Sequence, residues 1–240
     1  MNILYESENL LVMNKPAGLV VHADGKHKEP TVVDWVEKKY PATKDVGEKM
    51  TIEHEGEDVA IARGGIVHRI DRDTSGCLLI AKNQKTFEWL KQQFQEHTIK
   101  KKYVAIVFGW IREDRGIIDK PIGRSHSDIR GWAVGSRARG VMRTAITRYV
   151  VRKRFTYQDS KYTVVDLYPQ TGRTHQLRVH MAHLGHAMVA DPIYAGNKKS
   201  QLPLTRTALH AEKITFKDLN GKEIEVTAPL PEDLAKNIQM

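Results

Sequence analysis

Residues 67–82 read VHRIDRDTSGCLLIAK, and this stretch carries the strongest local signal in the chain. Apolar runs lie on both sides of charged, turn-forming residues, a pattern typical of two strands joined by a turn. In an extended segment, residues two apart share a face, so Arg69, Asp71 and Asp73 should project together and Arg72 away from them. A guanidinium beside a carboxylate favours its ionised form, which a nucleophile or general base needs. On these residues alone, an Arg–Asp pair that only braces the turn is the competing interpretation.

Outward from this turn, the first half of the chain alternates short strands with two amphipathic helices. The elements we predict there are strands at 3–6 and 10–14, an extended run at 19–22, a helix at 31–40, strands at 66–70 and 77–82, and a helix at 83–97. The polar, partly acidic segment 42–65 is predicted to be an inserted surface loop or small hairpin.

The second half is rich in strands. We predict strands at 102–110, 141–155 and 162–168, a helix from Thr174 to Leu184, a hairpin of strands 209–216 and 223–227 across Asn220-Gly221, and a short helix from Pro231. Because strands and helices do not alternate regularly, the order predicts an α+β fold with a mixed, largely antiparallel central sheet flanked by helices and loops.

Composition limits the classes of function. The 240 residues carry 38 Lys and Arg against 29 Asp and Glu, a net charge of +9 that suits a polyanionic partner without proving one. The single cysteine, Cys77, excludes an intrachain disulfide, a cysteine zinc ribbon and an iron–sulfur cluster, and its apolar neighbours indicate a packing residue. No apolar run is long enough to span a bilayer and no signal peptide precedes the first strand, so we expect a cytoplasmic monomer with no membrane partner.

The charged turn closely resembles the His-Arg-Leu-Asp-x-x-Thr-Ser-Gly signature of the RluA-type pseudouridine synthases, with Ile70 in place of the usual leucine. Further segments resemble that family in the same order along nearly the whole chain. They are NKPAG (14–18), KKYVAIVFG (101–109), PQTGRTHQLRVH (169–180), HLGH (183–186), DPIY (191–194) and LHA (209–211).

The resemblance implies the pseudouridine synthase fold, with an active-site cleft across the sheet, as one catalytic domain over 1–240 made of two intimate halves sharing that sheet. It implies isomerisation of uridine to pseudouridine in a structured ribosomal or transfer RNA, without a metal, nucleotide or other cofactor. The family's frequent N-terminal RNA-binding domain of the S4 type is expected to be absent, because the catalytic pattern begins within the first residues.

The same matches imply roles for five residues. Asp71 falls on the essential aspartate, which acts as nucleophile or base toward the sugar, and the sequence does not choose between the two. Tyr103 matches a tyrosine that stacks on the target base, and Arg173 a basic residue that pairs with the aspartate. Leu177 matches an apolar residue of the same pocket. Arg69 matches an arginine that enters the duplex when the target nucleotide is flipped out, as a stacked, paired uridine requires.

Basic residues near these motifs are predicted to form a track for RNA phosphates. The track would include Lys100, Lys101, Lys102, Arg112, Arg115 and the five arginines of 124–143, with Trp132 placed to stack on an unpaired base. Solvated loops that only aid solubility are the alternative. The histidines His175, His180, His183 and His186 lack the i, i+4 spacing of a helical zinc site, so hydrogen-bonding or RNA-facing roles are favoured.

Two other classes of function compete with the synthase. An inactive RNA-binding relative would be expected to lack Asp71, Tyr103 or Arg173, and the chain has all three. A glycoside-cleaving hydrolase would need a second carboxylate opposite the first and would release free base. No such partner stands out, because Asp73 lies too near Asp71 in sequence to judge.

Overall fold

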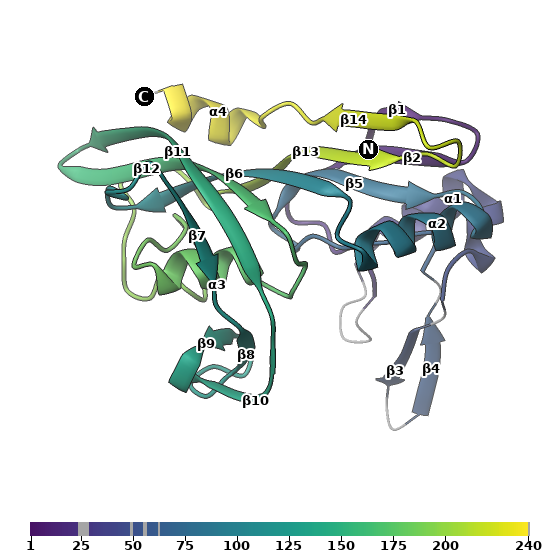
Figure 1. Cartoon of the computed structure of the whole chain (residues 1–240), viewed down its shortest axis with the longest axis horizontal. Helices are drawn as coiled ribbons and strands as arrows, with labels where there is room; N and C mark the ends of the chain where they lie inside the picture. The colour runs from purple at the N-terminus through teal and green to yellow at the C-terminus, as the bar shows by residue number, and fades with distance from the viewer. Residues whose placement is uncertain (24–28, 49, 55–56, 62, 240) are drawn as a thin grey trace. The chain divides into compact units, whose positions relative to one another are not determined.

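The computed structural model describes residues 1–23, 29–48, 50–54, 57–61 and 63–239. The chain forms two compact units, each built from two separate stretches (Figure 1). The first unit contains residues 1–100 and 213–228, and the second contains 101–212 and 229–240. Each unit is described by itself below. Whether both act as the single catalytic domain that the resemblance implies stays a prediction.

The first unit pairs its strands in an antiparallel manner and adds two helices. Its elements are β1 (Asn2–Glu6), β2 (Leu10–Lys15), α1 (Val32–Lys39), the 3-10 helix η1 (Pro41–Asp45), β3 (Met50–His54), β4 (Glu57–Ile61), β5 (Ser75–Ala81), α2 (Gln84–Gln95) and β14 (Glu223–Thr227), together with the end of β13 (Leu209–Lys217). Strand β2 lies between β1 and β5, with Leu10 opposite Ala81 and Lys15 opposite Gly76. This register places the end of β2 beside the turn that precedes β5.

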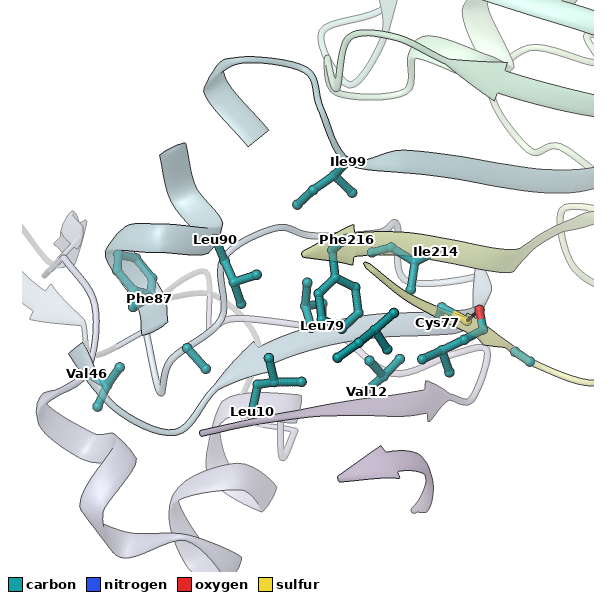
Figure 2. Packing of buried hydrophobic residues seen from close by; sticks show 14 residues of the cluster. Leu10, Val12, Val46, Cys77, Leu79, Phe87, Leu90, Ile99, Ile214 and Phe216 are labelled. Carbon is teal, nitrogen blue, oxygen red and sulfur yellow. Dashed lines mark hydrogen bonds between the residues drawn. The ribbon is translucent and has the colours of Figure 1, made fainter. Parts of the chain in front are cut away.

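The core of the first unit forms where α2 covers these strands. Phe87 and Leu90, one turn apart on α2, belong to one buried cluster with Leu79 of β5 and Phe216 of β13 (Figure 2). Asn83 caps α2, since its side chain accepts a hydrogen bond from the Thr86 N–H at 3.0 Å. Cys77 is buried in the same cluster, as its apolar neighbours predict.

The second unit also pairs its strands in an antiparallel manner. Its elements are the rest of β6 (Lys100–Phe108) and of β13, then β7 (Arg115–Asp119), β8 (Ile122–Ser125), β9 (Trp132–Val134), the 3-10 helix η2 (Gly135–Arg137), β10 (Ala138–Arg143), β11 (Ile146–Tyr157), β12 (Ser160–Pro169), α3 (Gln176–His183) and α4 (Glu232–Gln239). Strand β12 pairs with β6 on one side and β11 on the other, and β11 also pairs with β7.

Both faces of the second unit's main sheet are covered. Ala105 and Val107 of β6 pack in one cluster with residues of α3, whereas Val104 and Ile106 pack in another with Leu234 of α4. The alternation follows from the period of two in a strand. It identifies the face of β6 to which Tyr103 belongs, because Tyr103 packs in the α3 cluster.

Residues 122–143, which we call the arginine arm, form a small separate sheet in the second unit (Figure 1). Strand β8 lies in its centre, paired with β9 and β10. The arm packs on α3 through the contact between α3 and β9. The strands β7 to β9 were not predicted, because strands of three to five residues are too short to show a clear apolar alternation.

The α+β class with a largely antiparallel sheet is confirmed, as are the predicted helices and the hairpin that ends in β14. Residues 50–54 and 57–61 form a β-hairpin within the predicted 42–65 insertion, and positions 49, 55, 56 and 62 of that segment lie outside the described residues. Among the helices that the structure describes, none has the length and apolar content needed to cross a bilayer.

Three local predictions were wrong. Residues 66–70 do not form a strand, because the Leu79 N–H is donated to the side-chain Nε2 of His68 and only Ile66 forms a backbone bridge to β5. The predicted strand 141–155 is two strands, since the chain leaves the arm at Thr144 and joins β12 from Ile146 onward. Finally, α3 begins after His175 rather than at a Thr174 cap.

Candidate active site

The turn that carries Asp71 is fixed by a buried lysine from β2. Lys15 is fully buried, and its Nζ donates hydrogen bonds to the carbonyl oxygens of Pro16, Leu19 and Arg72 at 2.8, 2.8 and 2.9 Å. A buried ammonium is stable only when hydrogen-bonded in this way. Lys15 therefore ties the loop after β2 to the residue next to Asp71. Lys15 belongs to the family-like segment 14–18, but no pattern in the sequence predicted this role.

Further hydrogen bonds hold the two sides of this turn. The Gly18 N–H donates to the Arg72 carbonyl oxygen at 2.9 Å, and Arg72 Nε donates back to the Gly18 carbonyl at 3.1 Å. The Thr74 N–H donates to the Asp71 carbonyl oxygen at 3.1 Å, which closes a turn over residues 71–74. Asp71 is half-buried and Arg69 exposed. A carboxylate on such a pinned turn keeps its position when RNA approaches.

His68 anchors the other end of the segment. Its Nε2 accepts the hydrogen bond from the Leu79 N–H at 2.9 Å, and its ring stacks on Phe94 with centroids 4.8 Å apart. Arg69 and Asp71 therefore lie between two fixed points, His68 and Arg72. The structure brings these two predicted site residues onto one short loop of the first unit.

His22 is a buried imidazole that the sequence analysis did not single out. Its side chain is buried, and neither ring nitrogen has a hydrogen-bond partner among the described residues. Burial, assisted by the positive charges of Arg63 and Arg69, lowers the pKa of His22 to about 4. His22 is therefore neutral at neutral pH.

This shift predicts a loss of stability in mild acid. Because the unfolded chain binds the proton more tightly than the folded chain, the stability contributed by neutral His22 falls as the pH drops from about 6.5 toward about 4. We expect the free energy of unfolding to lose about 2 kcal/mol more between pH 7 and pH 5 in the wild type than in His22→Gln. Urea titrations at both pH values measure this difference. Equal pH dependence in the two proteins would show that His22 is not buried in the neutral form.

The second unit brings Tyr103 and Leu177 together. Leu177 is buried and Tyr103 half-buried in the cluster formed between β6, β12 and α3. The resemblance implies both as site residues, and Leu177 of α3 packs in the cluster on the sheet face that carries Tyr103. Their roles toward a nucleotide stay predictions.

Arg173 lies on the turn between β12 and α3, which the side chain of Gln176 holds. The Gln176 Oε1 accepts hydrogen bonds from the Arg173 N–H at 3.0 Å and the Thr171 hydroxyl at 2.7 Å. Its Nε2 donates to the Ile146 carbonyl at 3.0 Å. This buried amide replaces the predicted Thr174 cap as the organiser of the helix start. Arg173 Nε donates to the Thr144 carbonyl at 3.1 Å, which directs its half-buried guanidinium along the turn.

The three consecutive lysines of β6 have different environments, so they do not form one phosphate track. Lys102 forms ion pairs with Asp166 and Glu212, at 3.3 and 2.9 Å. Lys100 is exposed and lies 3.5 Å from Glu223. The ammonium end of Lys101 is buried, which lowers the pKa of Lys101 to about 8. A Cβ at Gly172 would lie 3.8 Å from its Nζ, so Lys101 reaches the Arg173 turn.

The histidines near α3 act as hydrogen-bonding residues. His180 is fully buried, with Nδ1 2.9 Å from the Thr147 hydroxyl and Nε2 3.0 Å from the Lys120 carbonyl. His186 Nδ1 lies 2.8 Å from the Phe108 carbonyl. Within the described ranges, no group of His, Cys, Asp and Glu side chains is arranged to hold a metal ion.

Trp132 of the arm packs rather than projecting. Its ring lies in a cluster with Ile122, Val179 and Tyr194, and the Arg124 guanidinium carbon is 4.5 Å from its centroid. Arg124 therefore covers the ring that the sequence analysis expected to stack on a base. Such stacking would require Arg124 to move.

Comparisons with known proteins agree with these features. A family model described as RNA pseudouridylate synthase matches residues 9–183. An uncharacterized RNA pseudouridine synthase of Bacillus subtilis, YlyB, is 38% identical over 100% of this chain and 72% of its own length. The ribosomal large subunit pseudouridine synthase D of Zymomonas mobilis is 36% identical over 98% of this chain and 70% of its own. The solved structure of human RNA pseudouridylate synthase domain containing 1 matches with a TM-score of 0.74 and 27% identity, covering 96% of this chain and 83% of that one.

Proposed function

The chain belongs to the RNA pseudouridylate synthase family, and from that membership we propose how its residues divide the work of the reaction. The protein is an isomerase that converts uridine to pseudouridine in RNA. The C1′–N1 bond of the nucleotide breaks, the uracil turns, and a C1′–C5 bond forms. The proton on C5 is lost and N1 gains one, so no atom is gained or lost overall.

In this proposal Asp71 acts on the sugar, as nucleophile at C1′ or as base. One observation supports this assignment most strongly. The Lys15 ammonium donates a hydrogen bond to the carbonyl oxygen of Arg72, the residue after Asp71, and so fixes the turn that carries Asp71. A group that acts on one carbon of a large substrate must be held in place before the substrate arrives. Arg69, exposed on the same loop, is suited to contact the RNA strand from which the uridine is flipped.

We assign residues of the second unit to the uracil base and to a supporting positive charge. Tyr103 and Leu177 would form the apolar surface against which the uracil lies while it is unattached. Arg173 would supply the positive charge that the resemblance assigns to the basic residue of the site. An apolar enclosure favours this chemistry, because it keeps the detached uracil from diffusing away and excludes water that would turn isomerisation into hydrolysis.

The proposed substrate is a structured region of large-subunit ribosomal RNA, with transfer RNA as the alternative. The support is that a relative covering 98% of this chain is named for the ribosomal large subunit. We place the reaction in the cytoplasm, with the protein acting as a monomer. The test is to incubate the purified protein with ribosomal and transfer RNA and to map pseudouridine in each. Free uracil as the product would contradict the assignment.

The arginine arm is proposed to hold the RNA backbone. Arg137, Arg139 and Arg143 are exposed, whereas Arg130 is bound by Asp128 through two hydrogen bonds at 3.1 and 2.8 Å. Ion pairing partly neutralises Arg130, so the other three are better placed to bind phosphates.

Removing these three charges should weaken RNA binding without stopping catalysis. For the triple variant R137A/R139A/R143A we expect RNA affinity to fall by about 10- to 100-fold at low salt, and the slope of log K against log salt to fall by about 2. Fluorescence anisotropy at several salt concentrations measures both quantities. The kcat at saturating RNA should fall by no more than about fivefold, because none of the three is assigned to the reacting nucleotide.

A charge-matched control separates a specific track from the general attraction of a basic protein. The variant K85A/K199A/K222A removes three exposed lysines that lie outside the arm. If it weakens binding as much as the arm variant does, the arm is not a dedicated phosphate track.

A further inference from the structure

The hydroxyl of Tyr194 connects the arginine arm to the turn that carries Arg173. Its Oη accepts a hydrogen bond from the backbone N–H of Trp132 in β9 at 2.9 Å. The same oxygen lies 2.9 Å from Nδ1 of His175, and the two rings meet edge-on with centroids 5.7 Å apart. One side chain thus bonds both to β9, an edge strand of the arm, and to the residue two positions after Arg173.

Tyr194 is itself held rigidly. The Asp191 Oδ1 accepts hydrogen bonds from the backbone N–H groups of Ile193 and Tyr194, both at 3.0 Å. Arg178 of α3 binds the same carboxylate through Nε at 2.7 Å and a terminal nitrogen at 2.8 Å, and both side chains are buried. The Arg178 guanidinium carbon is also 5.1 Å from the centroid of the Tyr194 ring. Tyr194 is therefore fixed to the body of the second unit.

The electrostatics agree with this arrangement. Burial alone would raise the pKa of Asp191, but the Arg178 guanidinium and the two backbone donors lower it below its ordinary value. Asp191 therefore stays ionised, and its grip on the Tyr194 backbone persists over the whole physiological range of pH.

His175 has an unusual backbone at the point where this connection reaches the Arg173 turn. Its φ of 55° lies in the left-handed region, and its side chain does not cap α3. For a non-glycine residue this conformation is unfavourable in free energy, so it persists only where contacts with surrounding residues stabilise it. The hydrogen bond to Tyr194 is one such contact. A shift of Tyr194 Oη would consequently act on the turn, and through it on the position of Arg173.

We propose that Tyr194 is a positioning residue that couples RNA engagement by the arginine arm to the placement of Arg173. The arm's β9 strand fixes the tyrosine hydroxyl, the hydroxyl fixes the His175 ring, and the left-handed turn then presents the Arg173 guanidinium. This inference rests on the proposed function, in which the arm binds RNA and Arg173 supplies a positive charge to the reaction.

Tyr194→Phe tests the inference with a minimal change, because it keeps the ring and removes only the hydroxyl. We expect kcat for pseudouridine formation to fall about 10-fold, because the variant loses the two hydrogen bonds of the Tyr194 hydroxyl that position the turn. We expect KM to change less than about threefold. A merely structural hydroxyl would lower the melting temperature and leave the kcat of the folded enzyme unchanged. An unchanged kcat would therefore overturn the proposal.

Tyr162→Phe is the matched control. The Tyr162 hydroxyl also lies in the second unit and also accepts a hydrogen bond from a backbone N–H, that of Gln201 at 2.9 Å. Its ring packs in the α4 cluster, on the sheet face opposite Tyr103 and Leu177. We expect Tyr162→Phe to lose stability while keeping the wild-type kcat. If it reduces kcat as much as Tyr194→Phe, the effect is not specific to the connection.

A double-mutant cycle tests the coupling itself. Arg124→Ala removes the guanidinium that covers Trp132 in the arm. We expect it to lower kcat about fivefold in the wild type but less than twofold in Tyr194→Phe, because the connection is already broken there. Equal factors in both backgrounds would show that the arm does not act through Tyr194. If the wild type forms no pseudouridine at all, the proposed function fails instead, so the two failures are distinguishable.

Discussion

Asp71→Asn is expected to lower the rate of pseudouridine formation by about 10³-fold or more. The amide keeps the size of the side chain and can still accept one hydrogen bond, but it can neither attack C1′ nor remove a proton. Single-turnover assays on RNA that carries the target uridine measure the effect. RNA binding should stay within about threefold of wild type, because the phosphate contacts in this proposal lie on the arginine arm.

Asp73→Asn is the control for this variant. It makes the same chemical change two residues away in the same segment, and Asp73 is half-buried as Asp71 is. We expect it to keep activity within about 10-fold of wild type, a loss that alterations around a site commonly cause. Full activity in Asp71→Asn would remove the basis of the proposed mechanism. Comparable losses in both variants would assign the effect to the charge of the turn rather than to Asp71.

Lys15→Met is expected to produce the largest loss of stability. Methionine keeps the apolar stem but leaves the carbonyl oxygens of Pro16, Leu19 and Arg72 without their ammonium donor. Because Lys15 itself is fully buried, losing its three charge-assisted hydrogen bonds is costly, and we expect the free energy of unfolding to fall by about 4 kcal/mol. Since proteins of this kind are stable by only about 5–15 kcal/mol, urea denaturation should show the change clearly.

The activity of Lys15→Met distinguishes a positioning role from a purely structural one. Below the temperature at which it unfolds, the variant should still form pseudouridine more slowly, because the carbonyl that Lys15 holds belongs to the residue after Asp71. Lys82→Met is the matched control, since Lys82 donates to Glu6 and to the Ser7 carbonyl in a more exposed setting. We expect it to cost about 1 kcal/mol or less. If Lys15→Met forms pseudouridine at the wild-type rate, Lys15 contributes only to the stability of the fold and does not position Asp71.

The periodic elements of the fold were predictable because their apolar residues repeat at the spacing of a strand or helix. The helix over 84–95 follows from such a repeat, predicted at 83–97, and the strand over 75–81 follows from the continuous apolar run predicted as a strand at 77–82. The start of α3 was not predictable in this way. A buried glutamine, Gln176, replaces the expected cap, and its Nε2 is held by residues about 30 positions away.

In the candidate site, too, some features could be predicted from local sequence and others could not. A motif can name Asp71 and Tyr103, because the residue type itself carries the chemistry. It does not reveal that Lys15 holds the neighbouring carbonyl, that Lys101 is buried where Lys100 is exposed, or that Tyr194 joins two elements. These properties depend on burial and on contacts between distant parts of the chain, for which a local pattern of residues gives no signal.

The order in which the two units use the chain has a consequence for folding during synthesis. The core of the first unit contains Ile214, Phe216, Ile224 and Val226 beside residues from the first 100, and Leu234 fills the core of the second. While the ribosome is still adding residues 101–212, the apolar side chains of the first unit lack these partners. The nascent chain therefore keeps an incomplete core exposed for nearly half of its translation, and chaperones that bind apolar segments should engage it during that interval.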